Sequence, residues 1–87
     1  MANRPADFVT LLLCLGEREG DGTGAVAAQR IVGAIASVAH DPEVAHGMED
    51  DFRDACLRLA AAGHPNAQAV CAVAIETSAL DFERWTA

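Results

Sequence analysis

The chain has 87 residues, a formal net charge of −7 and a sequence pI of about 4.6. This length suits one domain, and we expect residues 1–87 to form a single helical domain. The acidic balance argues against direct binding to nucleic acid or to an anionic membrane, because both are negatively charged. No apolar run approaches the 20 or so residues that a membrane span requires.

The three cysteines, Cys14, Cys56 and Cys71, lie in separate apolar segments. An odd number without paired spacing is typical of free thiols and not of a disulfide framework. Residues 1–10 also lack the cleavage pattern of a signal peptide. We therefore expect buried, reduced thiols in a cytoplasmic protein.

The first helix is predicted from about Pro5 to Leu15. Pro5 suits the first helical position, and Asp7 suits the positive N-terminal end. The apolar residues that follow have the i, i+3, i+4, i+7 spacing of a helix face that packs on a core. These residues are Phe8, Leu11, Leu12 and Leu15.

The segment EREGDGTG at residues 17–24 is predicted to be a glycine-rich loop. It has the glycine content of a phosphate-binding loop, but it lacks the GK[ST] ending and carries three acids, which repel phosphate. We therefore expect no nucleotide site there. Thr23 is a candidate N-cap for a second helix that runs to about Ala39.

An Asp-Pro pair at residues 41–42 separates the second helix from the third, since the residue before a proline disfavours the helical region. The third helix is expected to run to about Ala62, and Gly47 leaves open whether it is broken. A Gly-His-Pro sequence at residues 63–65 ends it. Asn66 is then a candidate cap for the fourth helix.

The stretch from Ala67 to Leu80 has only two strongly polar side chains, Gln68 and Glu76. A helix that is apolar nearly all round is usually buried, so we expect this stretch to be the central helix. A last short turn is expected at Phe82–Trp85. No run alternates with the period of two that marks a strand. The predicted fold is all-α: a compact four-helix bundle with a short fifth C-terminal helical turn.

The strongest functional feature is the acidic stretch between Asp41 and Asp54. Six acids and one arginine lie in these fourteen positions, so the stretch carries −5 of the total −7. The candidate partner-binding residues are Glu43, Glu49, Asp50, Asp51 and Asp54. On a continuous helix, positions 43, 50 and 54 project together. Neighbours four residues apart are about 5–6 Å apart at Cβ, near the spacing of successive phosphates, so such a row can imitate a nucleic-acid backbone.

The alternative is an ordinary solvated helix face, which is what most charge runs are. Acids near a helix N-terminus complement the helix dipole, and Glu49–Arg53 and Asp54–Arg58 are ordinary i, i+4 pairs. A further alternative concerns aliphatic residues that fall off the main core stripes. If these residues cluster, they form a homodimer or adaptor surface; they are Val9, Leu13, Val32 and Leu57.

We expect no catalytic residue, no metal site and no cofactor. His46 and Asp50 are four residues apart, but His40 lies beyond a helix boundary, and a catalytic zinc site requires three protein ligands in fixed geometry. The cysteines have apolar neighbours, whereas a nucleophile needs a base and electropositive surroundings. No residue set supplies a nucleophile, a base and an oxyanion donor together.

These features favour a non-enzymatic protein that binds another protein. In its concrete form, the chain is an acidic inhibitor or decoy that covers the basic, nucleic-acid-binding surface of a partner. Phage inhibitors of bacterial defence complexes act in this style, an analogy of size and charge alone. The competing hypothesis is a structural or adaptor module that self-associates through exposed aliphatic surface. Salt dependence separates the two, because an electrostatic complex weakens with ionic strength and an apolar dimer does not.

Overall fold

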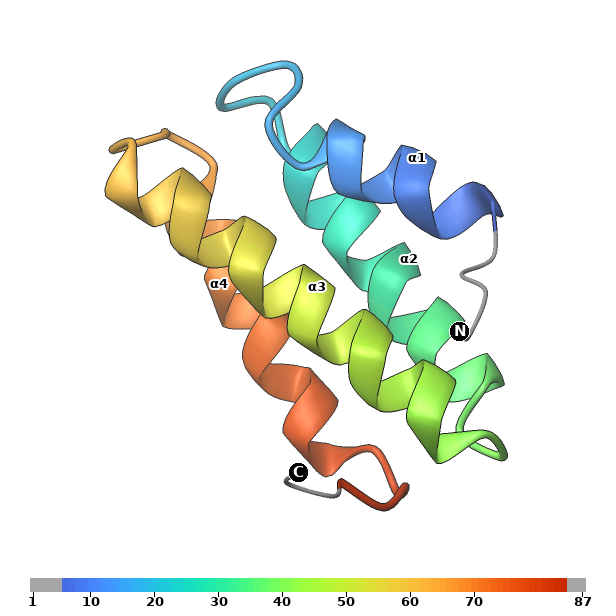
Figure 1. The fold of residues 1–87 in the computed structure, drawn as a ribbon. Helices are drawn as coiled ribbons and strands as arrows, with labels where there is room; N and C mark the ends of the chain where they lie inside the picture. The colour runs from blue at the N-terminus through green and yellow to red at the C-terminus, as the bar shows by residue number, and fades with distance from the viewer. Residues whose placement is uncertain (1–5, 85–87) are drawn as a thin grey trace.

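A computed structural model describes residues 6–84 and shows four α-helices followed by a 3-10 helix (Figure 1). The elements are α1 (Ala6–Cys14), α2 (Thr23–Ser37), α3 (Pro42–Ala61), α4 (Ala67–Ala74) and the 3-10 helix η1 (Ile75–Ala79), which continues α4 directly. No strand occurs within this part of the chain. Among the same residues, no helix combines the length and the apolar character that crossing a membrane requires.

The predicted all-α four-helix bundle is confirmed, but its short fifth element lies earlier than expected. The expected fourth helix changes from α4 to η1 at Ile75, and residues 81–84 are not helical. Trp85, part of the expected last turn, lies outside the described residues. Arg84 accounts for the end of the helix, because its Nη2 donates to the carbonyl oxygens of Thr77 at 2.7 Å and Leu80 at 3.2 Å. Carbonyls bound in this way no longer need a further helical turn.

The prediction that residues 67–80 form the central helix is wrong. Ile75 is 72% exposed, and Ala69 and Ala72 also face solvent. The helix that contacts α1, α3, α4 and η1 is α2. Its inner face carries small residues at three positions, which allow neighbouring helices to approach closely, and two isoleucines: Gly24, Ala27, Ala28, Ile31 and Ile35.

The core stripe predicted for the first helix is confirmed, and α3 has a core-facing side of its own. Phe8 and Leu15 from the first helical segment and Met48 and Phe52 from α3 are all buried. α3 runs without interruption through Gly47. Its N-terminus is capped by Asp41, whose side chain accepts a hydrogen bond from the backbone N–H of Val44 at 3.4 Å. The third helix is therefore one rigid rod along the bundle.

Asn66 joins the loop after α1 to the start of α4. Its side-chain carbonyl accepts the N–H of Gly20 at 2.9 Å, and its amide donates to the carbonyls of Leu15 at 2.9 Å and Glu17 at 3.3 Å. The residue is buried. It makes no side-chain cap for α4, so its predicted capping role is wrong, because its side-chain oxygen and amide group bond to the loop after α1 instead.

The glycine-rich segment is shaped by this same contact. A Cβ atom at Gly24 would lie 2.6 Å from the carbonyl oxygen of Leu15 and 2.9 Å from Nδ2 of Asn66. Gly20 and Gly22 have positive φ angles of 79° and 88°, a conformation that glycine adopts without strain. Close packing and loop geometry thus explain these three glycines without a phosphate ligand.

The central position of α2 predicts a contrast between two alanines on it. Ala28→Asp places a carboxylate at a buried position, whereas Ala36→Asp places one on the exposed side of the same helix. We expect A28D to lower the free energy of unfolding by about 3 kcal/mol or more. A36D should change it by about 0.5 kcal/mol or less. Thermal unfolding followed by circular dichroism measures both, and equal melting temperatures would contradict this packing.

A second substitution separates the two roles considered for Asn66. Asn66→Asp keeps the side-chain acceptor but removes both donors, so the carbonyls of Leu15 and Glu17 would face a carboxylate. We expect a loss of about 2–3 kcal/mol at pH 7, measured by urea unfolding beside the exposed control Gln68→Glu. A capping role would tolerate the change, since Asp caps as well as Asn. An N66D protein as stable as Q68E would therefore contradict the cross-bundle role.

Candidate functional site

Four of the five predicted partner-binding acids are exposed on α3. These four are Glu43, Asp50, Asp51 and Asp54. Because α3 is unbroken, positions 43, 50 and 54 lie seven and four residues apart on one stripe of the helix. We call Glu43, Asp50 and Asp54 the acidic stripe. The core-facing side of α3, with Met48 and Phe52, lies opposite.

Two residues of the acidic stripe each lie beside a nitrogen-bearing side chain of the same helix, Asp54 beside Arg58 and Asp50 beside His46. Oδ2 of Asp54 accepts a hydrogen bond from Nε of Arg58 at 2.8 Å, and Oδ1 of Asp50 lies 3.5 Å from Nε2 of His46. The hydrogen bond and the charge of Asp54 raise the pKa of Arg58. The side chains of Asp50 and Asp54 are still 67% and 61% exposed, so both carboxylates are accessible to a partner.

Glu49, the fifth predicted partner-binding residue, does not lie on this exposed face. Its side chain is 2% exposed, and its carboxylate receives two hydrogen bonds from Arg84, at 2.9 Å from Nε and 3.1 Å from Nη2. Nη2 of Arg53 lies 3.7 Å away. Arg84 also lies over the ring of Phe82, 3.9 Å from its centroid. Glu49 therefore anchors the segment after η1 to α3 and is not accessible to a partner.

The ion pair keeps Glu49 ionised despite its burial. Burial raises the pKa of the Glu49 carboxyl, but hydrogen bonds to Arg84 and Thr77 and the charges of Arg53 and Arg84 outweigh burial and hold the pKa below its ordinary value of 4.5. The hydrogen bond to Glu49 in turn raises the pKa of Arg84. One sequence signal could have identified this residue: Glu49 lies three positions before Phe52 and seven before Cys56, which is a core-side spacing.

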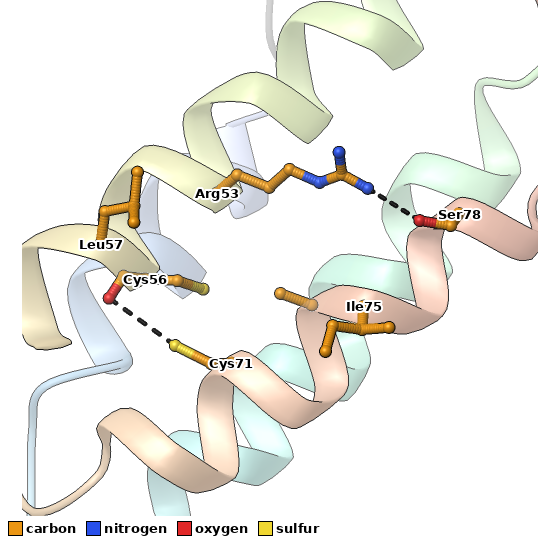
Figure 2. Close-up of a pocket in the computed structure, with 7 residues that line it drawn as sticks. Arg53, Cys56, Leu57, Cys71, Ile75 and Ser78 are labelled. Carbon is orange, nitrogen blue, oxygen red and sulfur yellow. Dashed lines mark hydrogen bonds between the residues drawn. The ribbon is translucent and has the colours of Figure 1, made fainter.

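A groove of about 450 Å³ lies between α3 and the α4–η1 segment (Figure 2). Its lining residues are Arg53, Cys56, Leu57, Cys71, Ala74, Ile75 and Ser78. Leu57 and Ile75 are 69% and 72% exposed. Nη2 of Arg53 reaches from α3 to η1 and donates to the hydroxyl oxygens of Ser78 at 3.0 Å and Thr77 at 3.2 Å. The groove thus has aliphatic rims and a polar end.

The predicted surface aliphatics do not all belong to this groove. Val9 and Leu13 are exposed on α1, whereas Val32 packs partly against the core. Leu57 alone among the four borders the groove. Ile75, its counterpart on η1, was missed from the sequence because it was assigned to a buried helix.

The chemistry of the two groove cysteines does not indicate a nucleophile. Sγ of Cys71 donates to the carbonyl oxygen of Cys56 at 3.8 Å. Burial, followed by the proximity of Cys71, raises the pKa of the Cys56 thiol to about 12. Since the thiolate is the reactive form, Cys56 is inert at neutral pH. Cys14 and Cys71 are only half-buried, and all three thiols are free.

The described residues contain no group of three or more histidine, cysteine, aspartate or glutamate side chains that could hold a metal ion. Within the same residues, every buried side-chain nitrogen or oxygen atom has a hydrogen-bond partner. No buried side-chain nitrogen or oxygen atom there is therefore unpaired.

Comparison with known proteins assigns no function. No protein-family model, curated protein or solved structure matches this chain. The function must therefore be argued from the acidic stripe and the groove.

The buried ion pair predicts a specific pH dependence for Glu49→Gln. Because folding lowers the pKa of Glu49, the pair stabilises the wild type above pH 4.5 and loses this effect as the pH falls below 4.5. We expect E49Q to be less stable than the wild type by about 2 kcal/mol at pH 7. The difference should shrink progressively below pH 4.5.

Urea unfolding between pH 7 and pH 3 measures this difference. The neighbouring exposed acid supplies the control, since Asp50→Asn should change stability by about 0.5 kcal/mol or less. A difference between E49Q and wild type that stayed constant over the whole pH range would contradict an ionised, hydrogen-bonded Glu49.

Proposed function

We propose that this chain is a non-enzymatic protein-binding module whose acidic stripe covers a basic surface of a partner protein. The observation that carries the proposal is the exposure of Glu43, Asp50 and Asp54 on one unbroken helix. The withdrawal of Glu49 into an ion pair with Arg84 adds support. It leaves the exposed acids on one stripe of the helix, seven and four residues apart, and pairs the one acid that faces the core.

The form of the proposal that fits this geometry best is an inhibitor or decoy of a nucleic-acid-binding protein. The helix holds the Cβ atoms of Asp50 and Asp54, four residues apart, at about 5–6 Å, with Glu43 two turns earlier on the same stripe, and it can therefore stand in for a few phosphates. The net charge of −7 attracts a basic surface over long range and repels nucleic acid itself. The three free thiols are consistent with a reducing compartment such as the cytoplasm.

A second candidate function is self-association through the groove. It is favoured by the exposure of Leu57 and Ile75 on facing rims. The charge of −7 on each copy opposes this association, and the opposition is strongest at low salt. The acidic-stripe proposal therefore ranks first, and ionic strength separates the two functions in solution.

The test compares the wild type and E43K/D50K/D54K as immobilised baits in a nuclease-treated lysate of the source cells. At about 0.05 M salt the wild type should capture a basic protein that about 0.5 M salt releases. Reversal of the stripe places like charges across the contact, which costs several kcal/mol. The triple variant should therefore bind this protein roughly 100-fold more weakly or not at all, with an unchanged helical circular dichroism spectrum.

The matched control is E17K/E76K/E83K, which changes the net charge equally at three exposed acids outside α3. The control should retain the partner. If both variants lose the partner equally, total charge and not the stripe determines binding. If neither variant loses it, the acidic-stripe proposal is contradicted.

A further inference from the structure

The groove adds an apolar element directly beside the acidic stripe. Leu57 lies seven residues after Asp50 and three after Asp54, so it falls on the same side of α3 as both. Ile75 stands on the opposite rim (Figure 2). Imitation of a nucleic-acid backbone does not require two exposed aliphatic side chains. These residues therefore point to a partner that makes apolar contacts as well as charged ones.

The shape of the groove suits an inserted aliphatic side chain. Its floor consists of the small residues Cys56, Cys71 and Ala74, which are buried or half-buried. Arg53 reaches across to Ser78 at one end. An aliphatic residue entering between Leu57 and Ile75 would remove all three side chains from water. Each fully buried side chain of this type contributes roughly 1.5–3 kcal/mol to apolar contacts.

We infer that the partner docks through a basic amphipathic helix, one apolar side chain of which enters the groove while its arginines or lysines contact Asp50 and Asp54. This inference rests on the proposed function and deepens it by naming the chemistry of the partner's contact segment. An amphipathic helix laid in an apolar groove is a recurring mode of recognition, in which anchor residues are spaced along one helix face.

Charge complementarity selects this occupant over a second copy of the chain. A second copy carries −7 and presents its own Asp50 and Asp54 beside the same groove. A two-fold contact through the groove would therefore bring like charges together. A basic helix has the opposite sign along the whole stripe.

Arg53 limits where the positive residues of the partner can lie. Its guanidinium already donates to Thr77 and Ser78 and lies 3.7 Å from Glu49. An arginine or lysine of the partner would be repelled at this end of the groove. The basic residues must therefore flank the anchor on the α3 side, over the acidic stripe.

The test uses a fluorescein-labelled peptide of roughly 18 residues, or five helical turns. It carries leucines along one face and arginines on the flanks of that face. A second peptide has serine for every leucine, and a third has glutamate for every arginine. Binding to the full chain is measured by fluorescence anisotropy at about 0.15 M salt. The first peptide should bind, the second at least tenfold more weakly, and the third not at all.

Protein variants locate the binding. Leu57→Asp and Ile75→Asp should each weaken binding of the first peptide at least tenfold, although the added negative charge would strengthen purely electrostatic binding. Leu13→Asp alters an equally exposed leucine on α1, 71% exposed, and should leave affinity unchanged or slightly improved. Circular dichroism confirms the fold of each variant.

Three outcomes would overturn the inference. In the first, the leucine and serine peptides bind equally well, L57D and I75D bind them as the wild type does, and E43K/D50K/D54K binds neither. This result would support the proposed function but would exclude a role for the groove. No binding of the first peptide above the third would refute the docked helix. A dimer in sedimentation that L57D and I75D dissociate, with no peptide bound, would assign the groove to a second copy. A different result would contradict the proposed function itself: E43K/D50K/D54K would still capture the partner protein from the lysate.

Discussion

The ion pair between Glu49 and Arg84 lies on the core-facing side of α3, and this orientation of α3 determines which of its acids are exposed. Glu49 turns inward to meet Arg84, on the side of the helix that also carries Phe52 and Cys56. The acidic stripe must then point to solvent, since it lies on the other side of the same helix. Only the Glu49 side of this ion pair is buried, and the hydration that Glu49 loses offsets part of the stability that the pair contributes. Its consequence here is positional: it anchors the C-terminal segment and leaves the acidic stripe outward.

Local periodicity predicted those features that depend on one face of one helix. The core stripe of the first helix and the all-α fold are of this kind. Glu49 was assigned to the surface because its partner lies 35 residues away, although its spacing to Phe52 indicated the core side. Asn66 bonds to Leu15 across 51 residues, which no local pattern reveals. The run 67–80 was misleading because alanine costs little when exposed, so an alanine-rich helix need not be buried.

Under the proposed function, the acidic stripe and the groove would form one binding surface with two physical components. The carboxylates would supply long-range attraction, which governs the rate of encounter and falls with salt. Leu57 and Ile75 would supply apolar contact, which acts only after docking and resists salt. The lifetime of the complex would then depend mainly on apolar contacts in the groove. The selection of a basic partner would depend mainly on the carboxylates of the acidic stripe. The hydrogen bonds of Arg53 to Thr77 and Ser78 connect the two walls of the groove.

Carboxylate footprinting of the complex with the captured partner tests most directly whether the acidic stripe is the binding surface. Carbodiimide coupling labels exposed acids, and mass spectrometry reports the extent of labelling at each residue with and without partner. Binding through the acidic stripe predicts strong protection of Asp50 and Asp54 in the complex and unchanged labelling of Glu17 and Glu83. Unchanged labelling of Asp50 and Asp54 in a saturated complex would contradict it.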